Sequence, residues 1–127
     1  MHSLGIHHVA VHARAAGVEA VAAFYRETVG LQELARHRNP DGSLRSIWLS
    51  LSTQGEEAAG FLAVEEGDSF GPAMIALRID AASRGALLDR LIARAVAVQK
   101  QTQWTVYVDD PAGNHLGFSH HPQDPVA

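Results

Sequence analysis

Cysteine is absent from this 127-residue chain, which excludes a disulfide framework and a thiolate metal site and suits a reducing compartment. No apolar run approaches the roughly 20 residues that a membrane-spanning helix needs. The first residues also lack the basic stretch and the apolar run of a secretory signal. We therefore expect a soluble, cytoplasmic protein that has no membrane partner.

Basic residues are scarce and scattered. The 10 Lys and Arg residues stand against 14 Asp and Glu residues, which gives a net charge of −4. Proteins that bind nucleic acid gather Lys and Arg on one face, because phosphate contacts supply most of the non-specific affinity. The sequence therefore predicts no nucleic-acid partner.

What the chain does contain is two similar halves. Strand-like openings at Ile6–Val11 and Met74–Asp80 each precede a helical pattern, expected over 18–29 in the first half and around 87–95 in the second. Gly30 follows the first helix at the position where a left-handed cap is common. Further strands are expected at 34–38, 46–51 and 60–65 in the first half, and at 96–99, 105–108 and 115–120 in the second.

This repeat predicts an α+β fold built from two βαβββ modules in a single domain, 1–127. Hydrophobic residues make up 46% of the chain and supply enough apolar surface for its core. The boundaries are expected at about 4–66 for module one, about 66–72 for a linker, about 73–121 for module two and 122–127 for a tail.

Three motifs carry a resemblance to a known family: HHVAV at His7–Val11, AFYRETVGL at Ala23–Leu31 and VDDPAGNHLGF at Val108–Phe118. The chain resembles the vicinal oxygen chelate superfamily, which includes glyoxalases, extradiol dioxygenases, fosfomycin-resistance enzymes and bleomycin-resistance proteins. The match spans nearly the whole chain, and the motifs are specific for the fold rather than for one function. The resemblance implies two modules whose curled mixed sheet surrounds a cleft, often completed by a second subunit, so we expect a homodimer.

The resemblance also implies where a divalent metal would be bound, and three of the four positions carry no ligand here. The opening His of the first module corresponds to His8, and the carboxylate on the last strand of that module corresponds to Ala63. The opening His of the second module corresponds to Met74, whose thioether is a poor ligand for hard cations. The glutamate after the DP-x-G-N turn corresponds to Gly117. We therefore expect no metal cofactor.

A rearranged metal site stays open as an alternative. Glu65 and His115 share strand faces with two of the lost positions, so the candidate ligands are His8, Glu65 and His115. His12 faces the same way as His8, but four residues at about 3.3 Å each separate their backbones by roughly 13 Å, which is too far for one ion.

Strand alternation predicts which side chains face the cleft. The set is apolar and aromatic with a few polar groups, as small-molecule pockets usually are. Arg78 indicates an anionic ligand, although pairing with an acidic neighbour or solvation would explain it equally. The predicted ligand-binding residues are His8, His12, Trp48, Phe61, Met74, Arg78, Tyr107 and His115.

Two functions fit these residues. The first is a metal-independent binding protein of the bleomycin-resistance type, which holds a small aromatic or anionic molecule between Trp48, Phe61 and Tyr107. The second is a lyase or dioxygenase of the glyoxalase type, in which a divalent metal polarises vicinal oxygens. A metal-free enzyme would use His8 or His12 as its catalytic base, because imidazole titrates near neutral pH. No carboxylate that would orient either ring is evident in the sequence.

Overall fold

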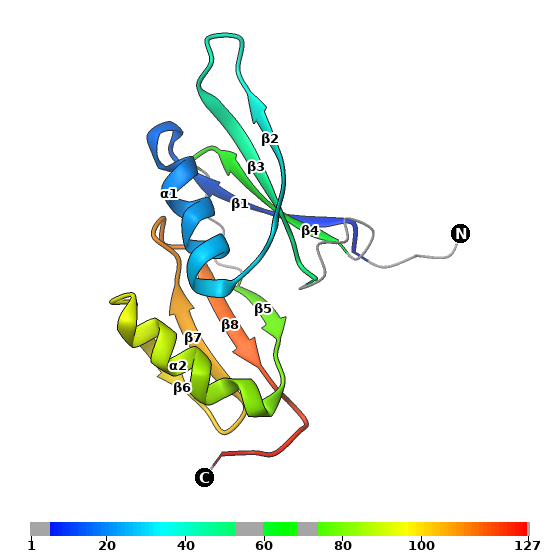
Figure 1. Cartoon of the computed structure of the whole chain (residues 1–127), viewed down its shortest axis with the longest axis vertical. Coiled ribbons are helices and arrows are strands. Elements are labelled where there is room, and N and C mark those ends of the chain that lie inside the picture. The colour runs from blue at the N-terminus through cyan, green and yellow to red at the C-terminus, as the bar shows by residue number, and fades with distance from the viewer. Residues whose placement is uncertain (1–5, 53–59, 69–73, 127) are drawn as a thin grey trace, which may run out of the picture. The chain divides into compact units, whose positions relative to one another are not determined.

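The chain folds into two compact units, which we call unit 1 (1–70) and unit 2 (71–127). The computed structural model describes residues 6–52, 60–68 and 74–126 (Figure 1). Most of the linker expected at 66–72 lies outside these residues, and Glu66 belongs to the last strand of unit 1. Among the described residues, no helix combines the length and the apolar character that crossing a membrane would require.

Unit 1 is a four-stranded mixed sheet covered by one helix. Its strands lie in the order β1-β4-β3-β2, with β1 parallel to β4 and the other neighbours antiparallel. The helix α1 continues without a break into a wider, π-helical turn. The bounds are β1 His8–Ala13, α1 Val18–Ala23, the π-helical turn Phe24–Val29, β2 Glu33–Arg38, β3 Leu44–Ser50 and β4 Phe61–Glu66.

Unit 2 repeats the topology of unit 1. Its strands lie in the order β5-β8-β7-β6, with β5 parallel to β8 and the other neighbours antiparallel. The α+β fold with two βαβββ modules is therefore confirmed, and the two sheets are open at their edges. The bounds are β5 Met74–Arg78, α2 Arg84–Ala93, β6 Val98–Gln101, β7 Thr105–Asp109 and β8 His115–Ser119.

Helix ends explain where the predicted boundaries hold and where they shift. Gly30 has φ 93°, and the amides of Gly30 and Leu31 both donate to Tyr25 O, so the predicted left-handed cap is present. The strand expected from 96 begins at Val98 instead. The reason is that the Val96 amide donates to Leu91 O and closes the end of the second helix, which leaves it unable to pair in the sheet.

The core of unit 1 lies between α1 and one face of the sheet. Val18, Val21 and Ala22 of the helix are buried, and α1 packs on β3 and β4 (Figure 1). The opposite face of the same strands carries the predicted site residues, because side chains alternate along a strand. The buried sheet residues that face the helix are Val11, Ala13, Ile47, Leu49, Leu62 and Val64.

An ion-pair network joins α1 and its π-helical extension to β2. Glu19 and Glu33 each pair with both Arg26 and Arg36, at N–O distances between 2.7 and 3.3 Å. Hydrogen bonds from the Arg36 guanidinium hold the pKa of both carboxyls below their usual range, against the opposing effect of partial burial. The network is partly exposed, so solvent screens its contribution to stability.

Glu33→Gln is expected to lower the free energy of unfolding by about 0.5 to 1 kcal/mol at neutral pH, the usual size for a screened ion pair. Because the pKa of Glu33 is lower in the folded than in the unfolded state, its stabilisation is present above the unfolded pKa and is lost as pH falls through the folded pKa. In urea unfolding, the difference between variant and wild type should therefore shrink as the pH is lowered through and below the unfolded Glu pKa of about 4.3. Asp89→Asn, at an exposed carboxylate on α2, is the control. If the difference in the free energy of unfolding between Glu33→Gln and the wild type stayed the same at acid pH, this account would be contradicted.

Candidate functional site

Three rings stack across the open face of the unit 1 sheet, and a fourth ring is tilted against the end of the stack. Phe61 lies between His8 and Trp48, with ring centroids 4.9 Å from His8 at an interplanar angle of 8° and 4.3 Å from Trp48 at 23°. His37 continues the row at 4.5 Å from Trp48, with its ring tilted by 59° rather than stacked. Phe61 is buried, whereas Trp48 is partly exposed and His8 is exposed. We call His8, Phe61, Trp48 and His37 the ring stack.

His12 and Glu65 are the other two predicted polar site residues of unit 1, and the strand register places both far from His8. His8 is level with Phe61, whereas Glu65 is level with His12, four residues further along the parallel strands. His12 packs closely under the backbone of Gly67, where an added Cβ would lie 3.0 Å from the imidazole. His8 and Glu65 are therefore as far apart as His8 and His12, and the rearranged ligand set is not brought together.

Unit 2 offers a pocket of about 380 Å³ on its sheet. The register sets Met74 opposite His115 and Tyr107 opposite Gly117. Three of the predicted ligand-binding residues thus line one pocket. The described residues that line it are Met74, Gln99, Lys100, Tyr107, Val108, Asp109, His115 and Leu116.

The space above Gly117 is already filled. A Cβ added at Gly117 would lie 3.3 Å from Thr105 Cγ2, 3.3 Å from Tyr107 Cε1 and 3.4 Å from Met74 Sδ. All three contacts are tighter than or at the limit of ordinary van der Waals approach. The position that the resemblance assigns to a ligating glutamate is therefore packed by neighbouring side chains.

An imidazole–carboxylate pair lies at the rim of this pocket. His115 Nδ1 is 2.7 Å from Asp109 Oδ1, and the two residues face each other across the last rung of the β7–β8 hairpin. Asp109 was not predicted as a site residue. The signal that would have found it is the hairpin turn itself, since Asp109 and His115 directly flank the segment held together by Asp110 and Asn114.

These residues do not fit the divalent metal that the resemblance implies. Ala63 and Gly117 offer no donor, Met74 offers a thioether, and Glu65 is displaced from His8 along the sheet. Within the part of the chain that the structure describes, no group of three His, Asp or Glu side chains could hold a metal ion.

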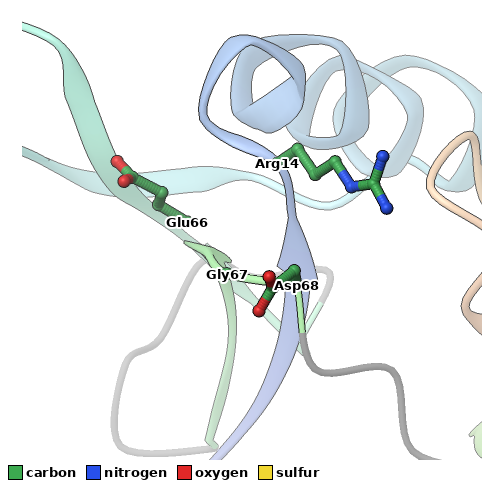
Figure 2. A pocket seen from close by; sticks show the side chains of 4 residues that line it. All are labelled: Arg14, Glu66, Gly67 and Asp68. Atoms are coloured by element: carbon green, nitrogen blue, oxygen red, sulfur yellow. The ribbon is translucent and has the colours of Figure 1, made fainter.

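Two further features lie outside both the ring stack and the lining of the unit 2 pocket, and one of them is Arg78, which was predicted to bind the ligand. Arg78 is exposed at the end of β5, level with Ser119, and has no ion pair among the described residues. A second hollow, of about 330 Å³ in unit 1, is lined by Arg14, Glu66, Gly67 and Asp68. Figure 2 shows the Arg14 guanidinium pointing away from the carboxylates of Glu66 and Asp68, so these charges do not converge on one ligand group.

Solved structures with the same arrangement of elements decide the fold. TnmS3, an antibiotic-binding protein from a Streptomyces species, is 25% identical, with 99% of each chain covered and a TM-score of 0.71. Lactoylglutathione lyase from Agrobacterium tumefaciens is 19% identical over 94% of this chain and 95% of its own, with a TM-score of 0.73. The chain has the vicinal oxygen chelate fold. FosX, a fosfomycin resistance protein from Listeria monocytogenes solved with Mn(II) and 1S,2S-dihydroxypropylphosphonic acid, is 16% identical over 96% of each chain, with a TM-score of 0.74.

The vicinal oxygen chelate fold supports different functions in these neighbours, namely antibiotic binding, a lyase and fosfomycin resistance. The sequence matches no protein-family model and no curated protein. The resemblance predicted from the three motifs is confirmed at the level of the fold. What the chain does must come from its own side chains.

Proposed function

We propose that the protein binds a small planar molecule, aromatic or anionic, without a metal ion. The observation that carries this proposal is the register of the two sheets. The small residues at the two carboxylate positions, Ala63 and Gly117, stand opposite the aromatic residues Trp48 and Tyr107. Aromatic rings bring a large contact area at low entropic cost, and in both units they take the place that the resemblance gives to metal ligands.

Exposure of the rings supports binding on these faces. Trp48 and Tyr107 are partly exposed. Phe61 is buried and stacks on Trp48. In unit 2, Tyr107 and Met74 give the pocket an apolar wall, and His115 and Lys100 give it polar groups. Such a mixture suits a flat ligand with one polar or charged end.

The alternative is a divalent-metal lyase or dioxygenase with rearranged ligands, and it requires at least three converging protein ligands. The described residues offer no such set. An antibiotic-binding neighbour with the same fold supports the binding proposal more directly. The homodimer implied by the resemblance and the cytoplasmic location expected from the sequence stay predictions.

Trp48→Ala is expected to weaken the binding of planar aromatic acids about tenfold, because the loss of one stacked ring costs about 1.4 kcal/mol. Ligands are first selected from a library of such acids by their effect on the melting temperature, and affinities are then measured by calorimetry. Trp104→Phe is the matched control. Trp104 packs against His121 and belongs to neither the ring stack nor the pocket lining, so its replacement should leave the affinity unchanged.

Two results would contradict the proposed function. One is a library in which no compound raises the melting temperature, or in which Trp48→Ala binds every hit as tightly as the wild type. The other comes from titrating the untagged protein with Ni(II), Zn(II) or Mn(II). Stoichiometric metal binding that His8→Ala abolishes would overturn the metal-free part of the proposal, since His8 is the one family ligand that remains.

A further inference from the structure

The Asp109–His115 pair is built as an acid–base group. The carboxylate of Asp109 can only accept a hydrogen bond, so the proton of the neutral imidazole lies on Nδ1, which is 2.7 Å from Asp109 Oδ1. Nε2 is then the nitrogen that carries the free lone pair. Among the described residues, the His115 side chain makes no hydrogen bond other than the one to Asp109. A carboxylate that fixes the tautomer and stabilises the imidazolium is the usual partner of a histidine base.

Among its described lining residues, the pocket around this pair has one cation and an apolar wall. Lys100 lines it from β6, with Nζ 6.0 Å from the centroid of the Tyr107 ring. Met74 lines it from β5. The ionisable side chains of the lining are Lys100, Tyr107, Asp109 and His115, and Gln99 adds a neutral amide. A ligand in this pocket therefore meets a base and an ammonium group within the same 380 Å³.

We propose that this pocket takes a hydroxyaromatic ligand and removes its acidic proton, so that the ligand is held as its phenolate. His115 Nε2 accepts the proton: the ligand O–H bond breaks, an N–H bond forms, and the electron pair stays on the ligand oxygen. Asp109 is the positioning residue that stabilises the resulting imidazolium, and Lys100 stabilises the phenolate. The inference rests on the proposed function, because it names the ligand class that the same aromatic faces bind.

The pairing of opposite charges in the pocket favours this proton transfer. Before it, the pocket holds the Asp109 carboxylate and the Lys100 ammonium beside a neutral imidazole and a neutral ligand. After it, the pocket holds two positive groups, the imidazolium and Lys100, and two negative groups, Asp109 and the phenolate. Each new charge thus has an opposite neighbour, which stabilises the ionised form.

The test uses 4-nitrophenol, whose phenolate is yellow and whose neutral form is not. Spectra of the probe are titrated against the full-length protein across pH, and the pKa of the bound probe is compared with that of the free probe. We expect the pKa of bound 4-nitrophenol to fall by about one unit or more, which is a tenfold preference for the anion. Asp109→Asn keeps a hydrogen-bond acceptor for Nδ1 but removes the charge, so it should abolish most of this shift while changing the affinity for the neutral probe little.

Three further variants complete the test. His115→Gln should abolish the shift, Lys100→Met should reduce it, and His121→Gln, at an exposed histidine outside the pocket lining, should leave it at the wild-type value. Circular dichroism and melting curves establish that each variant is folded. All four substitutions fall on side chains that are at least partly exposed, so folding should be retained.

The non-ionisable analogue 4-nitroanisole separates the two proposals. If 4-nitroanisole binds and 4-nitrophenol binds without a change in its pKa, or does not bind, the acid–base inference is wrong and the proposed function stands. If neither probe nor any other planar aromatic compound binds, the proposed function is wrong and the inference falls with it. A pKa shift that survives in both His115→Gln and Asp109→Asn would also overturn the inference, because another group would then be responsible.

Discussion

Arg84→Met should lower the free energy of unfolding by about 3 kcal/mol, since it strips the donors from a buried hydrogen-bond network. Arg84 lies in the first turn of α2 and is 6% exposed. Its Nη2 donates to Thr102 O at 2.8 Å and to Gln101 Oε1 at 3.1 Å, and its Nη1 is 3.0 Å from His120 Nε2. None of these partners is a carboxylate.

The tautomer of His120 joins its two side-chain hydrogen bonds into one continuous network. A guanidinium can only donate, so His120 Nε2 accepts from Arg84 and the ring proton lies on Nδ1, which donates to Gln123 O at 2.7 Å. His120 is 2% exposed. The same network holds the start of the tail expected at 122–127, whose Val126 amide also donates to Gln103 O. Removing Arg84 leaves a buried imidazole nitrogen and a carbonyl without a donor, and each such loss costs about 1 to 3 kcal/mol.

Chemical unfolding followed by circular dichroism measures this loss. Arg45→Met is the matched control, because Arg45 is an exposed arginine on β3 and its replacement should change stability by less than about 0.5 kcal/mol. If Arg84→Met and Arg45→Met unfold at the same denaturant concentration, the network is not a stabilising one and this interpretation of α2 is wrong.

Phe61→Ala should lower the free energy of unfolding by about 4 kcal/mol, the usual range for emptying a buried aromatic site. Phe61 is 1% exposed, so the deleted ring would leave a cavity flanked by His8 and Trp48. Both flanking rings also lose their stacked partner. The variant therefore weakens the ring stack as well as the fold.

Phe61→Leu separates these two effects. It keeps most of the apolar volume and should cost only about 1 to 2 kcal/mol, yet it removes the ring between His8 and Trp48. Unfolding monitored by Trp48 emission in a Trp104→Phe background reports both stability and the surroundings of Trp48. Equal stabilities of Phe61→Ala and Phe61→Leu would show that packing volume at this position does not matter and would contradict the expectation.

Local patterns predicted much of this architecture. The helix over 18–29 and its cap at Gly30 depend on contacts within a few residues, and strand alternation depends only on the period of the chain, so both are readable from sequence. The faces on which Trp48 and Tyr107 lie followed from that alternation. The sequence was therefore sufficient to predict the features that depend on contacts within a few residues.

Features that depend on distant pairings were not predictable in the same way. The position of Glu65 along the sheet relative to His8 is set by the register of the parallel pair β1 and β4. Parallel strands are joined by a long crossover connection, so short-range patterns do not show this register. The contact between Arg84 and His120 joins residues 36 positions apart. The Asp109–His115 pair lies between these cases, because a tight hairpin makes it, and attention to the register of that hairpin would have predicted it.

The repeat of the two sheets has a further consequence. Equivalent positions hold Ser50 and Phe61 in unit 1 but Asp109 and His115 in unit 2, on matching rungs of matching strands. Under the two proposals, the repeated scaffold would carry two kinds of chemistry, with stacked rings in one copy and an imidazole–carboxylate pair in the other. Substitutions at Asp109 and His115 would then alter the second copy while leaving the strand pairs of the first copy unchanged.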